Sequence, residues 1–124
     1  METLKIKSFT DLNAWKEGHK LVLDVYRITK NFPKEEQFRL VGQLCRAVVS
    51  VTSNIAKGFS RNSAKEKVQF YAMSLGSLTE VQNQLLIGRD LGYISKEDFT
   101  ITANQSVIVS KLIRGLMKTA QSRH

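Results

Sequence analysis

Residues 43–61 constrain the fold more than any other part of the chain, because their apolar side chains recur at steps of three or four. That period is typical of a helix that buries one face. The apolar positions in and just before this stretch are Val41, Leu44, Val48, Thr52, Ile55 and Phe59. The opposite face is polar and consists of Gln43, Arg46, Ser50, Asn54 and Lys57. No acidic residue lies between Glu36 and Glu66, so this polar face is either a seam against another helix or subunit, or a basic surface for an anionic partner.

Helical periodicity before and within this stretch predicts the first two helices. Thr10 or Asp11 can cap the first helix by accepting a hydrogen bond from a free backbone N–H. That helix should end near Asn31, because Pro33 disfavours helical geometry at the residue before it. The second helix should have Pro33 in its first turn and run to Gly58, whose left-handed conformation would close it.

Two serines, each followed three residues later by an acid, mark the starts of a third and a fourth helix. Such capping boxes satisfy backbone N–H groups that have no partner within the helix. The two patterns are Ser63 with Glu66, and Ser95 with Asp98. We expect the third helix to close at Gly92 and the fourth to run to about Ala120. The third helix has two faces of apolar and small residues, so it should pack against two neighbours.

Four amphipathic helices with short connections predict an all-α protein, an antiparallel up-and-down four-helix bundle. A length of 124 residues suits one domain over residues 1–124, with residues 1–9 as an irregular N-terminal tail. Each apolar stripe is wider than a coiled-coil seam, so we expect a homo-oligomer to cover the surplus. No apolar run could cross a bilayer and the N-terminus lacks a signal peptide, so we expect a cytoplasmic protein without a membrane partner.

The charge balance favours an anionic partner. Nineteen Lys and Arg against eleven Asp and Glu give a net charge of +8, which raises the expectation of nucleic-acid binding. We predict phosphate contacts from cations along the second and fourth helices, namely Arg39, Lys57, Arg61, Lys111, Arg114 and Lys118. No aromatic residue is interleaved with these cations along the helices, so base stacking is not indicated. The alternative is that both helices present ordinary solvated faces.

Arg46 is interpreted differently from those cations, because amide side chains flank it on the polar face. Glu80 is the one acid in the long middle of the third helix. We predict that Arg46 and Glu80 form a structural polar pair between the helices, so that Arg46 does not face phosphate.

The sequence offers no constellation for catalysis, for a cofactor or for a metal ion. Cys45 is the only cysteine and sits within apolar periodicity, which excludes an internal disulfide and a cysteine-based metal cluster. His19 and His124 lack the local spacing of a metal site, and we interpret His19 as a core or interface residue. A metal-dependent nuclease would need clustered acids, and a phosphate loop would need clustered glycines. We therefore predict a non-enzymatic protein.

A series of motifs resembles the intervening-sequence proteins, which are encoded within insertions in bacterial 23S ribosomal RNA genes. The resemblance covers about residues 9–117. Its motifs are Phe-x-Asp-Leu-x-x-Trp from Phe9, Val25-Tyr26, Phe32-Pro33, Gln-x-x-Arg-Ala from Gln43, Ser50, Asn-Ile-Ala-x-Gly from Asn54, Arg61, Gly-Ser-Leu-x-Glu from Gly76, Gln84-Leu85 and Leu-Gly-Tyr-Ile from Leu91. One position departs from the family pattern, because Lys57 stands where the family usually has Glu.

This resemblance implies a four-helix bundle that assembles as a ring, a homopentamer, and it brings no catalytic residues. The related accessory variability determinant proteins of diversity-generating retroelements imply nucleic-acid binding and a reverse-transcriptase partner. Together with the charge, the resemblance predicts a non-enzymatic, oligomeric protein that binds nucleic acid, with RNA as the favoured ligand. The alternative function is a self-assembling scaffold or protein adaptor that does not bind nucleic acid.

Overall fold

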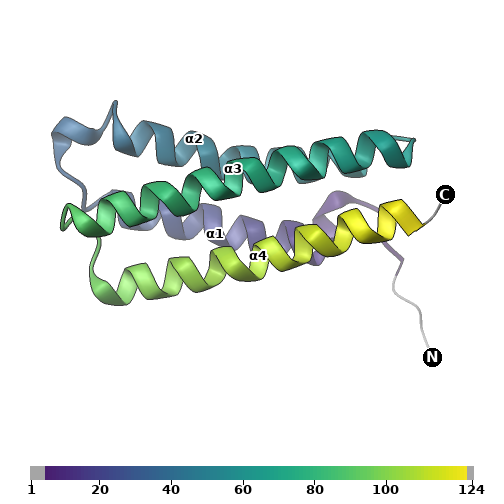
Figure 1. Ribbon diagram of the computed structural model, residues 1–124. Helices are drawn as coiled ribbons and strands as arrows, with labels where there is room; N and C mark the ends of the chain where they lie inside the picture. Colours follow the sequence, from purple (N-terminus) through teal and green to yellow (C-terminus); the bar gives the residue numbers. More distant parts are fainter. Residues whose placement is uncertain (1–4, 123–124) are drawn as a thin grey trace.

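The computed structural model describes residues 5–122, which form four α-helices and two short 3-10 turns without any strand (Figure 1). The elements are η1 (Phe9–Asp11), α1 (Asn13–Thr29), η2 (Lys34–Glu36), α2 (Leu40–Phe59), α3 (Ala64–Asp90) and α4 (Lys96–Ser122). The predicted all-α class is confirmed. Of the predicted N-terminal tail, residues 1–4 lie outside the described residues, and residues 5–7 have no regular secondary structure.

Side-chain contacts show that neighbouring helices run antiparallel. Along the α1–α4 contact, Arg27 pairs with Asp98 near one end, and Gln105 Nε2 donates to the Glu17 carbonyl nearer the other. Each helix packs against two others, in the cyclic order α1, α2, α3 and α4 (Figure 1). The bundle therefore has two distinct ends. The α2–α3 loop end also holds the start of α1 and the end of α4, and the α3–α4 loop end also holds the α1–α2 connection.

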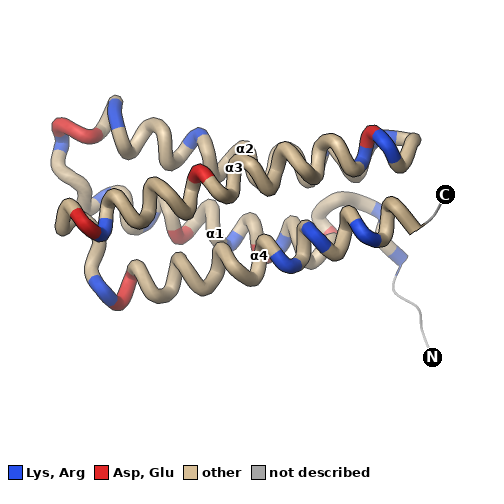
Figure 2. The backbone as a smooth tube through the Cα atoms, in the orientation of Figure 1, with Lys and Arg blue, Asp and Glu red and all other residues tan. Residues whose placement is uncertain are grey.

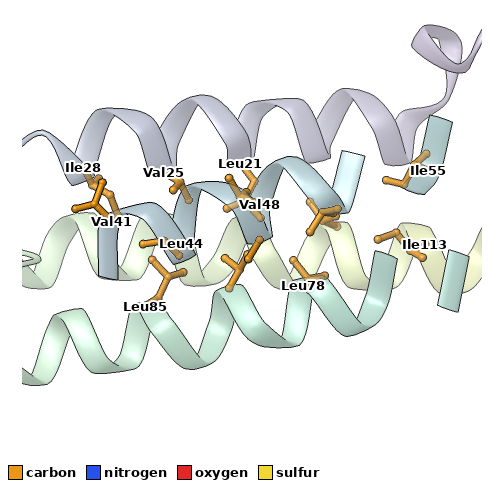
Figure 3. Close-up of a cluster of buried hydrophobic side chains, with 14 of the residues drawn as sticks. Leu21, Val25, Ile28, Val41, Leu44, Val48, Ile55, Leu78, Leu85 and Ile113 are labelled. Atoms are coloured by element: carbon orange, nitrogen blue, oxygen red, sulfur yellow. The ribbon is translucent and has the colours of Figure 1, made fainter. Parts of the chain in front are cut away.

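The core is built from side chains of all four helices, which meet along the bundle axis (Figure 3). The predicted stripe of α2 is confirmed: five of its six members are buried and Phe59 is half-buried. The largest fully buried side chains are Leu21, Val25 and Ile28 of α1, Leu44, Val48, Val51 and Ile55 of α2, Leu78, Val81 and Leu85 of α3, and Val109 and Ile113 of α4. Burying apolar surface of this kind is the dominant stabilising term for such a fold.

Short 3-10 turns replace the predicted starts of the first two helices. Ser8, not Thr10, caps η1, in a capping box that uses the Asp11 carboxylate, and α1 begins only at Asn13. Pro33 precedes η2 rather than opening α2, which begins at Leu40. The prediction extended both helices too far because a 3-10 turn and the first turn of an α-helix have similar end signals.

The two glycines predicted to close helices behave differently. Gly92 has a φ of +80° and follows the end of α3, as predicted. Gly58 lies inside α2 and does not adopt the left-handed conformation, so the prediction for α2 was wrong. A Cβ on Gly58 would lie 2.6 and 2.8 Å from two ring carbons of Tyr71, which means that a glycine here lets α3 approach α2 closely.

His19 is exposed, contrary to its placement in a core. The buried face of α1 includes the small residues Ala14 and Gly18 as well as the large aliphatic side chains, and His19 lies outside that face. The His19 ring instead stacks on Trp15, with their ring centroids 4.7 Å apart. Whether His19 contacts another subunit stays a prediction.

Candidate nucleic-acid interface

Five of the six cations predicted to contact phosphate lie at the α2–α3 loop end. Lys111, Arg114 and Lys118 follow one another at helical spacing along the exposed side of the C-terminal half of α4. Lys57 lies in the last turn of α2, and Arg61 follows that helix. The sixth, Arg39, immediately precedes α2 at the other end of the bundle. The twenty residues of α2 separate it from the other five by roughly 30 Å.

Charge is distributed unevenly between the two ends of the bundle (Figure 2). When each helix is divided at its midpoint, the α3–α4 loop end holds seven cations and seven carboxylates among residues 5–122. The α2–α3 loop end holds three carboxylates, from Asp11, Glu17 and Glu66, and eleven cations. These cations are Lys5, Lys7, Lys16, Lys20, Lys57, Arg61, Lys65, Lys67, Lys111, Arg114 and Lys118. The excess of positive charge in the described residues therefore belongs to one end.

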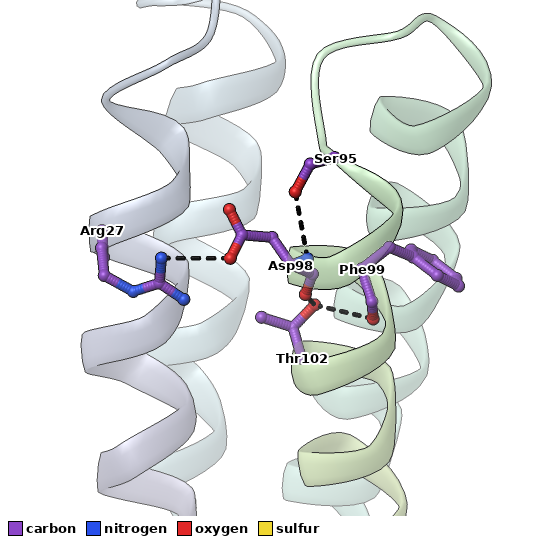
Figure 4. A network of polar contacts seen from close by, with 5 residues as sticks. All are labelled: Arg27, Ser95, Asp98, Phe99 and Thr102. Carbon is purple, nitrogen blue, oxygen red and sulfur yellow. Dashed lines mark hydrogen bonds and ion pairs between the residues drawn. The ribbon is translucent and has the colours of Figure 1, made fainter.

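Ion pairs occur at both ends of the bundle. At the α2–α3 loop end, Lys20 Nζ lies 3.7 Å from Glu17 Oε1. At the α3–α4 loop end, Arg27 Nη1 lies 3.2 Å from Asp98 Oδ1, and Arg89 pairs with Asp90 at 2.8 Å. The Arg27–Asp98 pair joins α1 to the first turn of α4, whose backbone Asp98 N–H is capped by Ser95 Oγ (Figure 4). The predicted Ser95–Asp98 cap is confirmed at the serine, while the Asp98 carboxylate binds Arg27. Three carboxylates cannot pair with eleven cations at the α2–α3 loop end, which leaves a surplus for an external anion.

Aromatic rings accompany the cations at the α2–α3 loop end. The guanidinium carbon of Arg61 lies 4.5 Å from the centroid of the Phe70 ring on α3. Lys67 Nζ lies 5.5 Å from the Phe59 ring centroid and donates to the Gly58 and Phe59 carbonyls, at 3.3 and 2.7 Å. These carbonyls form the negative end of the α2 dipole. Aromatic residues beside the cations were not expected from the sequence, because the pattern of a single helix does not show that α3 brings Phe70 to Arg61.

The polar face of α2 divides between the two alternatives that its sequence allowed. Its middle is a seam against α3, where the Ser50 and Ser77 hydroxyls lie 2.7 Å apart and the buried Asn54 donates to the Ser50 carbonyl at 2.9 Å. Ser74 Oγ of α3 also donates across this seam, to the Val51 carbonyl at 2.7 Å. The two ends of the face, at Gln43 and Lys57, are exposed.

The predicted pair between Arg46 and Glu80 does not form in this chain. Both side chains are exposed, and no ion pair joins them within residues 5–122. Glu80 Oε2 instead accepts a hydrogen bond from Gln84 Nε2, one turn along α3, at 3.4 Å. The Gln84 amide also donates to Gln43 Oε1 of α2, at 3.5 Å. Two amide side chains therefore form the polar contact between α2 and α3 that was predicted for Arg46 and Glu80.

A partly open pocket of about 520 Å³ lies at the α2–α3 loop end. Its walls are mostly apolar and come from the chain before α1, the end of α2, the start of α3 and the end of α4. The polar side chains on the walls are Asn62, Lys67, Tyr71 and Thr119. Tyr71 is 4% exposed, and its hydroxyl forms no hydrogen bond within residues 5–122. Burial raises the pKa of this phenol above its ordinary value.

Other chemistry-bearing groups are dispersed. Among residues 5–122, no three His, Cys, Asp or Glu side chains are arranged to hold a metal ion. Cys45 is half-buried beside the Thr29 hydroxyl, and burial raises the pKa of its thiol. Within the same residues, none of the helices combines the length and apolar character that a membrane span requires.

The match to known proteins agrees with the four-helix architecture. Residues 10–115 match the family of 23S rRNA-intervening sequence proteins. The chain belongs to this family. A crystal structure at 1.70 Å of a protein of unknown function from the S23 ribosomal protein family of Bacteroides thetaiotaomicron has the same fold, with a TM-score of 0.78 and 19% identity. That alignment covers 85% of this chain and 95% of the other. No curated protein matches this chain.

Several residues that carry the resemblance to intervening-sequence proteins have a structural role here. Asn54 is buried and donates within α2 to Ser50, whose hydroxyl contacts Ser77 of α3, and Gly58 allows the contact with Tyr71. Lys57, the position that departs from the family pattern, is exposed instead of packed. It lies in the last turn of α2, where the helix dipole favours a cation. In this intervening-sequence protein, Lys57 thus contributes one positive charge to the basic end.

Proposed function

We propose that this 23S rRNA-intervening sequence protein is a non-enzymatic, homo-oligomeric nucleic-acid-binding protein, with RNA as the favoured ligand. The observation that carries the proposal is the collection of eleven cations against three carboxylates at the α2–α3 loop end. A rigid helical end with this surplus binds phosphates by releasing their counterions, without any sequence-specific motif. Arg39 lies outside this surface, so the proposed phosphate contacts are Lys57, Arg61, Lys111, Arg114 and Lys118.

Exposed apolar side chains support the oligomeric part of the proposal. Phe38 is 95% exposed, and Leu23, Met73 and Leu91 are each more than half exposed. A small apolar groove of about 200 Å³ between α3 and α4 is lined in part by Leu86, Phe99, Ala103 and Val107. A solvated monomer tolerates single exposed apolar residues, but contiguous ones on neighbouring helices are typical of interfaces. A ring of five copies is the form that the family resemblance favours.

Matched charge reversals test the proposal. Reversing Lys111, Arg114 and Lys118 to Glu should weaken binding of a structured RNA by at least about tenfold at low salt. It should also flatten the slope of log K against log[salt] by about 0.7–0.9 for each phosphate that the variant no longer neutralises. The control reverses Lys34, Arg39 and Lys96, which are exposed at the α3–α4 loop end and change the net charge equally. If both triple variants lose affinity equally, binding depends on net charge and not on the basic end.

The scaffold alternative predicts a different outcome. A protein adaptor would bind no RNA even at low salt, and reversing Lys111 and Lys118 would leave its cellular activity unchanged. An assay for RNA cleavage with Mg²⁺ or Mn²⁺ present tests the non-enzymatic part of the proposal, since cleavage that purifies with the protein would contradict it.

A further inference from the structure

The pocket at the α2–α3 loop end is placed among the cations proposed to bind phosphate. Several wall residues are next to a cation in sequence: Ile6 lies between Lys5 and Lys7, Asn62 follows Arg61, and Thr119 follows Lys118. The pocket and these cations thus share the α2–α3 loop end, so a strand whose phosphates contact the cations can reach the pocket. Its volume of about 520 Å³ falls in the range of roughly 300–1,000 Å³ that is typical of small-molecule sites.

The walls of the pocket combine aromatic and apolar surface with a few polar groups. Phe59, Tyr71 and Leu116 provide apolar wall from α2, α3 and α4. Asn62 and Thr119 add an amide and a hydroxyl, which can both donate and accept hydrogen bonds. Tyr71 lines the pocket, and its hydroxyl has no hydrogen-bond partner within residues 5–122, so a ligand in the pocket could bond to it.

We propose that this pocket receives one unpaired base of a nucleic-acid strand whose backbone is held by the surrounding cations. The inference rests on the proposed function and narrows its ligand to strands with a bulged, looped or single-stranded base. A base has flat faces that pack against aromatic and apolar walls, and an edge that needs several donors and acceptors. An acyl chain cannot form hydrogen bonds with the Asn62 amide, the Tyr71 hydroxyl or the Thr119 hydroxyl on the pocket wall, whereas the edge of a base can, so the polar wall groups favour the base over an anionic amphiphile.

Three RNA hairpins separate the base from the backbone. The first has a single bulged adenosine, the second has an abasic ribose at the bulge and thus the same phosphates, and the third is fully paired. We expect the adenosine bulge to bind at least about fivefold more tightly than the abasic bulge, since stacking of a single base is worth about that or more. The abasic and the paired hairpins should bind equally tightly, through salt-sensitive phosphate contacts only.

Variants connect this preference to the pocket. Thr119→Trp places an indole in the pocket from an exposed helix position, and should reduce the adenosine-to-abasic ratio to about one. Gln121→Trp, exposed on the same helix but outside the pocket wall, should keep the ratio. Asn62→Trp, in the α2–α3 loop, repeats the test if Thr119→Trp fails to fold by circular dichroism. Tyr71→Phe should lower the ratio while preserving the packing of the ring.

Each contrary result has a distinct meaning. Salt-dependent binding of all three hairpins with a ratio of one in the unmodified protein would overturn the base pocket and leave the proposed function standing. No binding of any hairpin at low salt would overturn both. A ratio of one, combined with dodecanoate binding that Thr119→Trp blocks, would assign the pocket to an anionic amphiphile.

Discussion

Single residues at the α3–α4 loop end hold the ends of helices together. Tyr93, in the turn after α3, donates its hydroxyl hydrogen to Glu36 Oε2 in η2 at 3.1 Å, and its ring packs against Phe32 with the centroids 5.3 Å apart. These contacts join the α3–α4 loop to the connection between α1 and α2, which is far away in the sequence. The Leu-Gly-Tyr-Ile motif could be recognised from the sequence, but the partner of its tyrosine could not, because 57 residues separate Tyr93 from Glu36.

The Tyr93 contact makes stability depend on alkaline pH. The hydrogen bond to the Glu36 carboxylate, followed by burial and the charges of Glu36 and Glu35, raises the pKa of the Tyr93 phenol. Because this pKa is higher in the folded than in the unfolded chain, the contribution is fully present below the ordinary tyrosine pKa of about 10 and is lost as pH rises through the folded value. Residue-specific NMR titration should show Tyr93 ionising above its ordinary range.

Substitution of Glu36 by Gln gives the matching control for this titration. The Tyr93 pKa should fall back towards its ordinary value, because the amide can still accept a hydrogen bond but carries no charge. Equal titration of Tyr93 in the two proteins would contradict a role for the carboxylate.

At the scale of the helices, the length and apolar period of each segment determined its type, and all four helices were predictable. Their ends were less so, because Pro33 and Asp11 serve 3-10 turns that have the same local signals as helix starts. Gly58 shows a different limit of prediction from sequence. The sequence places a glycine near a helix end, but only the packing of Tyr71 against it shows why a side chain would not fit there. Thr102 and Ser106 are also buried in α4, where their hydroxyls bond to carbonyls of the preceding turn.

Two glycine-to-alanine substitutions should change stability in opposite directions. Gly58→Ala places a methyl group less than 3 Å from the nearly buried Tyr71 ring, and should destabilise the fold by about 1–3 kcal/mol through overpacking. A Cβ added at Gly76, in the middle of α3, would meet no heavy atom of residues 5–122 within 4 Å beyond its chain neighbours and its own helix backbone, so Gly76→Ala should stabilise by about 0.5–1 kcal/mol. Urea unfolding followed by circular dichroism measures both. A stabilising effect of Gly58→Ala would show that helix propensity, not the close α2–α3 approach, dominates at this position.

At the scale of the whole molecule, the candidate site was predictable in part. Helix positions identified Lys111, Arg114 and Lys118 as one exposed stripe, because helical spacing determines which residues share a face. Arg39 was grouped with them from the sequence, and the cations near the start of α1 and α3 were omitted, because only the antiparallel arrangement shows which helix ends are neighbours. The omitted cations include Lys5, Lys16 and Lys67. The pocket was not predictable for the same reason, since its walls come from four separated segments.

Assembly can be tested at the apolar groove between α3 and α4. Val107 is 47% exposed in this groove, so Val107→Glu should leave the helical content unchanged and shift the sedimenting species to a smaller mass. Asn104→Glu, exposed nearby on α4, adds the same charge outside the groove and should keep the original mass. If both variants sediment as the unmodified protein does, the groove is not a subunit contact.

The uneven charge also gives the bundle a direction. A rod that is neutral at one tip and strongly positive at the other is an electric dipole as well as a cation, so a polyanion attracts it tip first. If the chain binds RNA as proposed, its long axis would stand upright on the RNA surface instead of lying flat. In that orientation Phe38, which is 95% exposed at the other end of the bundle, would stay accessible from solution.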